Sequence, residues 1–166
     1  MQFGLASFAE LPFATEDVAI TGIAKSIEQL IKEAATTTLT GLTTTGSNIF
    51  VSRVHNLEQI KLPALLLYTR DLESEPIVMN PARTLEKNIT LHVEGYVKQN
   101  TNYDDKIDDI CQEVEEALYG NRLLNNLAKD TFLDETLVEY ESEGDNPLAR
   151  VVMDFQVVYH HNEGSL

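Results

Sequence analysis

Histidines with acidic neighbours are the residues of this chain best suited to bind a metal. His160 and His161 lie close to Glu163, but adjacent residues of a strand point to opposite faces, and no second group of ligands lies near them in the sequence. His92 and Glu94 fall on one face of another predicted strand, where they could hydrogen-bond or bind a metal between subunits. A polar pair on the surface is the simpler interpretation, so we expect no metal site.

The sequence also lacks the motifs of common enzymes and cofactor-binding proteins. It contains no glycine-rich phosphate loop, no G-x-S-x-G or H-E-x-x-H pattern and no EF-hand calcium loop. Cys111, the single cysteine, falls among the apolar residues of a predicted helix and has no histidine at a recognisable spacing. This favours a core position over a nucleophile. We therefore expect neither catalysis nor a bound cofactor.

Acidic residues are numerous and unevenly distributed. The formal net charge is −15, and the segment 104–145 holds 14 carboxylates against three cations, Lys106, Arg122 and Lys129. Phosphate binding depends on clustered Lys and Arg, so we expect no specific nucleic-acid binding. The acidic segment could be an ordinary solvated surface, a wall that repels nucleic acid passing close by, or a docking site for a basic partner. No apolar run approaches the roughly 18 residues that a membrane span needs, so we expect no membrane association.

One long strand, Leu85 to Lys98, is predicted to position His92 and Glu94. Residues of opposite character alternate along it, so it should have one dry face and one face that meets solvent or a partner. At roughly 3.3 Å per residue it would span about 46 Å, whereas the best neighbouring helix, 103–119, would span about 25 Å. The helix cannot cover the strand from end to end, so part of the strand should project.

The remaining elements predict an α+β fold. In chain order we expect a helix at 17–35, strands at 49–54, 62–70 and 85–98, a helix at 103–119, a short third helix at 121–129, and a hairpin of strands at 136–142 and 148–160. The order α-β-β-β-α-β-β favours two main helices packed on one face of a largely antiparallel or mixed sheet. Residues 62–70 are apolar at both odd-numbered and even-numbered positions, which is typical of a central strand buried on both faces.

The whole chain, 1–166, is expected to form a single domain with three irregular segments. Residues 1–14 carry five large apolar residues without a clean period. We expect them to form an N-terminal arm that packs on its own domain or on a neighbouring subunit. The Thr-rich residues 36–48 should end the first helix as a loop insertion, and the polar residues 71–83, with Pro76 and Pro81, should form an exposed loop.

Surface that one copy cannot cover predicts assembly. The candidate interface residues lie on the polar face of the long strand, at its glycine and beside the 71–83 loop: His92, Glu94, Gly95, Tyr96, Lys98, Arg70 and Arg83. Gly95 interrupts the apolar face, where we expect a close backbone approach. We expect Gly95→Val to leave the helices folded and to weaken association between subunits. Contacts between unlike patches propagate head to tail and close into a ring when the rotation allows.

In the order of its elements the chain resembles the tail terminator proteins of long-tailed bacteriophages, the minor tail protein U-like family. The resemblance covers about Asp17 to His160 and follows the segments ITGIAKSIEQLIKEA, LPALLLYTR, the strand ending HVEGYV, IDDICQEVEEALYG and ARVVMDFQVVYHH. The longer aromatic N-terminus and the Thr-rich stretch depart from the family pattern.

The resemblance implies a virion protein that assembles in the cytoplasm of the host bacterium. It implies a homo-oligomeric ring, generally a hexamer, that closes on the end of a finished tail tube. Such a ring stops polymerisation of the tail tube protein and presents a docking surface to the head–tail connector, while genome DNA passes through its lumen. The alternatives are another neck, head–tail joining or tail completion protein, or a small ligand-binding or hydrolytic α+β domain.

Overall fold

The computed structural model describes residues 25–51, 62–79, 83–98, 102–141 and 148–164. Within these ranges it contains two helices and five strands: α1 (Ile27–Leu39), β1 (Ile49–Phe50), β2 (Ala64–Pro76), β3 (Thr84–Lys98), α2 (Tyr103–Gly120), β4 (Asp130–Glu141) and β5 (Leu148–Asn162). The predicted α+β class and the order of the elements are confirmed.

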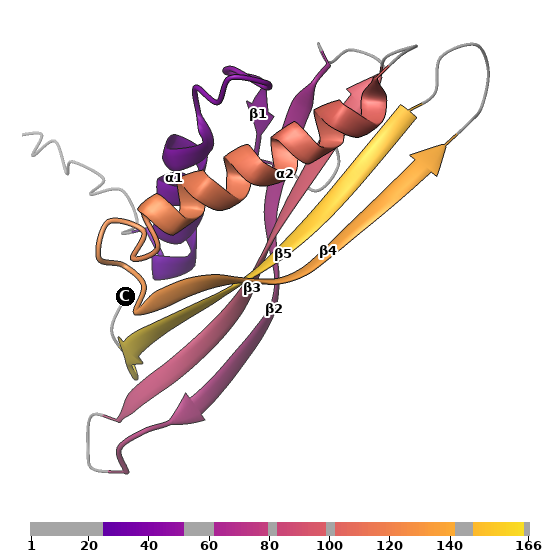
Figure 1. The fold of residues 1–166 in the computed structure, drawn as a ribbon. Helices are drawn as coiled ribbons and strands as arrows, with labels where there is room; N and C mark the ends of the chain where they lie inside the picture. The colour runs from indigo at the N-terminus through magenta and orange to yellow at the C-terminus, as the bar shows by residue number, and fades with distance from the viewer. Residues whose placement is uncertain (1–24, 52–61, 80–82, 99–101, 142–147, 165–166) are drawn as a thin grey trace, which may run out of the picture.

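The strands form one twisted sheet in the order β1-β2-β3-β5-β4. β1 pairs with β2 in parallel, and the other neighbours are antiparallel. Both helices lie on the same face of the sheet, with α2 running across β3 and β5 and α1 packed beside it against β2 (Figure 1). The far ends of β2 and β3 extend beyond both helices, as the length of the predicted strand requires.

The hydrophobic core lies between the helices and the sheet. Every second residue of β5 from Ala149 to Tyr159 is buried, as its alternation predicts. α2 turns its predicted apolar stripe toward the sheet: Ile107, Ile110, Val114 and Leu118 are all buried. β2 begins with four consecutive buried residues, 64–67, which confirms that its first part is covered on both faces.

α1 ends later than the sequence predicts. Its N-cap is Ser26, which exchanges two hydrogen bonds with Gln29 in a capping box. Residues 36–39 were expected to begin the loop insertion at 36–48, but they continue the helix because Leu39 is fully buried in the core. The hydroxyls of the three threonines donate to carbonyls four residues earlier, within the helix. The predicted arm, 1–14, and the predicted helix start at residue 17 lie outside the described residues.

β2 continues through Pro76, so the expectation of a loop at 71–83 is wrong for its first half. This polar stretch is a strand because β3 supplies a pairing partner, with residues 72–76 lying opposite residues 89–85. Asp71, with a φ of +44°, forms a bulge where the register shifts. The turn starts only at Ile77, whose N–H donates to the carbonyl of Thr84 (2.9 Å).

The predicted third helix does not form between α2 and β4. Leu124, Asn125 and Asn126 all have positive φ, which a right-handed helix does not allow. The chain makes turns here and buries Leu124. β4 begins at Asp130 rather than at Thr136 because its first residues pair with the far part of β5.

Candidate interfaces between subunits

The polar face of β3 is expected to meet solvent or a partner, and the structure contradicts this for three of its residues. His92, Glu94 and Tyr96 are only 6%, 5% and 8% exposed. They alternate with the core residues Leu91 and Val93, so they lie on the sheet face opposite the helices. Side chains of the neighbouring strands pair with them, so they form an internal network instead of a free interface.

Glu94 is the centre of this network. Its carboxylate accepts hydrogen bonds from the hydroxyls of Tyr68 (2.5 Å) and Tyr96 (2.6 Å) and from Nη2 of Arg150 (2.7 Å). Nη1 of Arg150 donates to Glu139 (2.7 Å), so the network joins β2, β3, β5 and β4. Burying a carboxylate without such partners would be strongly unfavourable, which explains why the partners are present.

The contacts of Glu94 shift the pKa values of the network. Burial raises the pKa of Glu94, but hydrogen bonds from Tyr68, Tyr96 and Arg150 outweigh burial and hold this pKa below its usual value. Burial, followed by the hydrogen bond to Glu94, raises the pKa of each tyrosine to about 12. Burial lowers the pKa of Arg150, but its bond to Glu94 raises it overall. The result at neutral pH is an ion pair with two neutral tyrosines, which suits a structural role.

His92 extends the network toward β5. Its ring stacks on Tyr68, with centroids 5.1 Å apart, and its Nδ1 lies 2.5 Å from Oδ1 of Asp154. Nε2 of His92 is buried and has no hydrogen-bond partner among the described residues. Throughout the ranges that the structure describes, no group of three His, Cys, Asp or Glu side chains is arranged to hold a metal ion. The contacts of His92 thus tie β3 to β2 and β5.

Gly95 lies in the core, so its predicted place at a subunit interface is contradicted. A Cβ at this position would lie 2.8 Å from Cγ1 of Val151 and 3.0 Å from Cγ2 of Ile110. The position is tightly packed, but the predicted approach of another backbone is not what the glycine accommodates: its nearest neighbours are side chains of β5, α2 and β2 in the same chain. The expectation that Gly95→Val spares the fold is contradicted as well, because a larger side chain would collide with this packing.

Arg70, Arg83 and Lys98 are exposed, but they do not form one patch. Arg83 precedes β3 and Lys98 is its last residue, so the length of the strand separates them by about 50 Å. Arg70 lies between them, beside the bulge in β2. Nε of Arg83 forms an ion pair with Oε2 of Glu163 (3.5 Å). The seven predicted interface residues are therefore divided between the interior and three separate surface positions.

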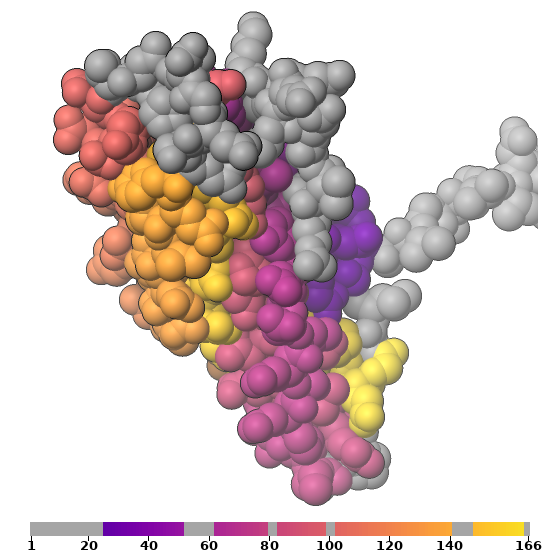
Figure 2. All heavy atoms as spheres, turned by 90° about the vertical axis from the view of Figure 1, so that its right-hand side faces the viewer, coloured from indigo at the N-terminus to yellow at the C-terminus, as the bar shows by residue number. Residues whose placement is uncertain are grey.

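The end of the β2–β3 hairpin, residues 72–79 and 84–88, carries an apolar tip that the sequence reasoning missed. We call these residues the projecting end; Figure 2 shows them as the tapering lower part of the molecule. Residues 70–76 of β2 are exposed, and so are four large apolar side chains: Leu72 (51%), Ile77 (49%), Val78 (41%) and Met79 (79%). The apolar run directly after Pro76 is the sequence signal that could have identified this surface.

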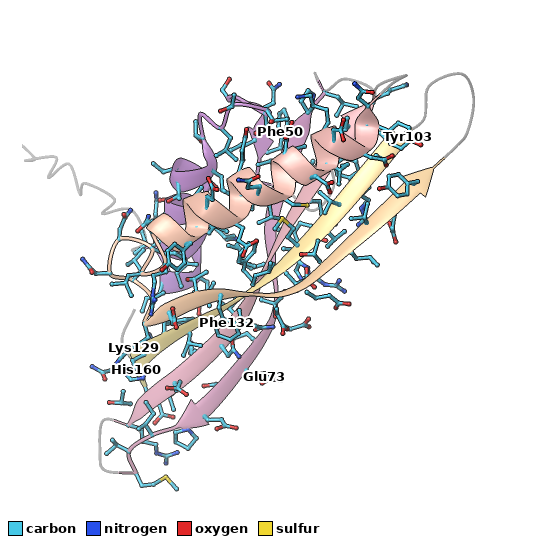
Figure 3. All side chains as sticks on the ribbon, viewed as in Figure 1. Phe50, Glu73, Tyr103, Lys129, Phe132 and His160 are labelled. Atoms are coloured by element: carbon cyan, nitrogen blue, oxygen red, sulfur yellow. The ribbon has the colours of Figure 1, made fainter. Side chains whose placement is uncertain are left out.

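The free edge of β4 is the second surface that the sequence reasoning missed. Among the described strands β4 pairs with β5 alone, and four of its large apolar side chains are exposed: Phe132, Leu137, Val138 and Tyr140. Between β4 and α2 lies a groove of about 740 Å³, which we call the α2–β4 groove. Phe132 lines it from β4 (Figure 3), and Glu115, Glu116 and Arg122 line it from α2 and the turn that follows. Apolar residues at both odd-numbered and even-numbered positions of an otherwise acidic strand are the sequence signal that could have identified this edge.

The chain matches no protein-family model and no curated protein. No helix in the described part of the chain is long and apolar enough to cross a membrane.

Proposed function

We propose that this protein is a structural, non-catalytic subunit that assembles into a ring and caps the tail tube of a long-tailed bacteriophage. The observation that carries the proposal is the projecting end, which extends past both helices and exposes large apolar side chains at its tip. The resemblance to tail terminator proteins suggests which assembly the ring belongs to.

The projecting end is poorly suited to remain in solvent. Neighbouring exposed apolar side chains mark sites of protein association. Leu72 and Ile77 are about half exposed, and Met79 is almost fully so. A second chain that covered them would gain roughly 25 cal/mol per Å² of apolar surface buried. The outer edge of β2 beyond its short pairing with β1 is also free among the described strands, so backbone groups are available to a neighbour.

The projecting end and the end covered by the helices are unlike surfaces. Contacts between unlike surfaces propagate head to tail and close into a ring when the rotation between neighbours allows. In the proposed role one face of the ring matches the last layer of the tail tube, and its other face does not nucleate a further layer. We further propose that the acidic segment 104–145 faces the lumen, where its charge keeps DNA phosphates from adhering.

Two alternatives can be distinguished by partner and by mass. A neck or head–tail joining protein would have the same size and acidity, but it would bind the portal side instead of the tail tube. The α2–β4 groove favours a small ligand-binding domain, because its volume of about 740 Å³ lies in the usual range of ligand pockets. That alternative predicts a stable monomer.

The deciding experiment compares virus particles made with and without this protein. Overlong tails that carry no heads would support termination, whereas headless tails of normal length would indicate a joining role. Tails of normal length that carry heads would contradict both.

A second experiment tests the projecting end itself. The mass of the purified chain is measured by light scattering over a range of ionic strength, together with the variants Met79→Asp and Tyr119→Asp. We expect Met79→Asp to dissociate the ring. Tyr119, near the end of α2, is a similarly exposed large side chain (73% against 79% for Met79), so Tyr119→Asp serves as the matched control and should leave the mass unchanged. A monomer under every condition would contradict the ring.

A further inference from the structure

We infer that the free edge of β4 and the α2–β4 groove bind an extended, basic segment of another protein, which adds a strand to the sheet. This surface does not include the projecting end, so the inference stands whether or not the subunits close into a ring. It is the alternative to a lumen position for the acidic segment 104–145, because a bound basic segment would cover these same residues.

β4 is an edge strand that lacks two of the common protections against pairing, Lys and Pro. Natural sheets blunt their edges with Lys, Pro, short strands or bulges. β4 has 12 residues and contains no Lys, Arg or Pro. Its one register shift, between Leu133 and Glu135, lies near its start and leaves a regular run after it. In that run, alternate residues direct their backbone N–H and C=O away from β5, where an added strand could pair with them.

Side chains on both sides of this edge offer apolar contact. Leu137, Val138 and Tyr140 are exposed on successive parts of β4, so an added strand would meet apolar neighbours on both of its faces. Phe132 is 48% exposed and lines the α2–β4 groove together with the partly buried Leu133. The groove thus provides room beside the edge for side chains of the added strand.

Charge determines which kind of segment this edge accepts. The acidic side chains of the surface are Asp130, Asp134, Glu135 and Glu139 on β4 and Asp108, Glu115 and Glu116 on the groove side of α2. Two of these carboxylates have a cation of the same chain beside them: Asp130 pairs with Arg122 (Nε–Oδ1 3.2 Å) and Glu139 with Arg150 (2.7 Å). The attraction for a basic segment therefore rests on the other five. Unlike charges on adjacent strands stabilise the pairing and like charges oppose it. The fitting occupant is therefore a segment in which Lys or Arg alternates with β-branched or aromatic residues.

A second copy of this chain fits the surface poorly. A second β4 would place its own acidic residues against those of the first. The projecting end, another exposed strand pair, carries Glu73, Glu75 and Glu86 and would also bring like charge to the groove. Its one cation, Lys87, is paired with Glu28 of α1. Charge complementarity thus favours a different, basic protein over self-pairing.

The test uses the full chain and a synthetic ten-residue peptide in which Lys alternates with Val and Thr, blocked at both ends. Binding is followed by fluorescence anisotropy at 50 mM and 300 mM salt, and the site is located by amide hydrogen exchange. We expect saturable binding that weakens at least tenfold at the higher salt, with new protection confined to β4 amides. A peptide of the same charge with every second residue N-methylated cannot complete a strand ladder, and it should bind at least tenfold more weakly.

Matched charge reversals separate this surface from the general acidity of the chain. Glu115→Lys with Glu116→Lys reverses two charges at the groove, and Glu73→Lys with Glu75→Lys reverses two on the projecting end, whose Glu73 is labelled in Figure 3. The groove variant should lose at least tenfold in affinity, and the control should lose less than twofold. Equal loss in both variants, equal binding of the N-methylated peptide, or no binding at 50 mM salt would each overturn the inference. Self-association through β4 in place of peptide binding would overturn it as well.

Discussion

The two halves of β3 obey one alternating pattern but lie in different surroundings. From Leu91 to Val97 every residue is buried, because α2 covers one face and the network around Glu94 fills the other. From Thr84 to Asn88 no residue is fully buried, because this half extends past the helices. Among the described helical side chains, Glu28 of α1 reaches this half through its contact with Lys87. Alternation thus predicts that a strand has two faces of different character, but it does not predict which face is buried.

The sharpest test of the covered half is Gly95→Val. The new side chain would collide with Val151 and Ile110, and we expect it to lower the free energy of unfolding by about 3 kcal/mol. Gly120→Val is the control, because open space surrounds Gly120 and this change should cost less than about 0.5 kcal/mol. Urea denaturation measures both. Equal urea midpoints for the two variants would show that the packing against Gly95 has room for a larger side chain.

Breaking the network around Glu94 should lower the free energy of unfolding by less than Gly95→Val does. Glu94→Gln removes the charge that pairs with Arg150 and accepts from Tyr68, so we expect a loss of about 2 kcal/mol in the free energy of unfolding. Arg150 keeps its bond to Glu139, which limits the loss. Glu73→Gln, on the projecting end, should change stability by less than about 0.5 kcal/mol. A Glu94→Gln variant as stable as the control would mean that the network adds nothing to the fold.

The contact of Glu28 with the base of the projecting end makes stability depend on acid pH. Burial raises the pKa of Glu28, but the hydrogen bond from Tyr159, with smaller contributions that include Lys87, lowers it from 4.5 to about 2. A lowered pKa means that the unfolded chain binds the proton more tightly, so stability falls as pH drops from about 4.5 to about 2.

Glu28→Gln should remove this pH dependence. Near pH 7 we expect the variant to be about 1 kcal/mol less stable than the parent chain, and near pH 2 the difference should vanish. Glu33→Gln, an exposed change on the same helix, is the control and should follow the parent. Chemical denaturation at a series of pH values gives the comparison. A constant difference across the series would contradict the assigned contact.

The smallest effects are expected in the exposed half. Leu72→Ser and Ile77→Ser should each change the stability of the isolated subunit by less than about 0.5 kcal/mol, because both side chains are already about half exposed. Leu65→Ala, at a fully buried site of the same hairpin, should cost about 3 kcal/mol. Thermal unfolding of dilute samples tests the contrast. A large loss from either serine variant would place the tip inside the folded unit.

Elements whose burial follows their own local pattern could be predicted from the sequence. β5 and α2 each bury the residues that their periodicity selects, from Val151 to Tyr159 and from Ile107 to Leu118. The second half of β2 could not be predicted, because its polar residues are held as a strand only by pairing with β3. The turn at 124–126 was missed because three consecutive left-handed residues follow an apparently helical pattern.

The candidate interface was less predictable than the fold. His92 and Glu94 have the residue types of a wet face, and their burial depends on Tyr68 and Arg150, which lie 26 and 56 positions from Glu94 in the sequence. Such pairings cannot be read from the strand itself. The exposure of Met79 and of the β4 edge depends likewise on where the helices end over the sheet.

The absence of Lys and Pro from β4 has a consequence for how the protein behaves in concentrated solution. Mutual repulsion between acidic copies keeps their open edges apart, and repulsion is the one protection that dissolved ions can remove. At molar salt the range of that repulsion shrinks to roughly 3 Å, less than the spacing of two strands. The colloidal stability of this protein is therefore a property of its solvent as much as of its fold.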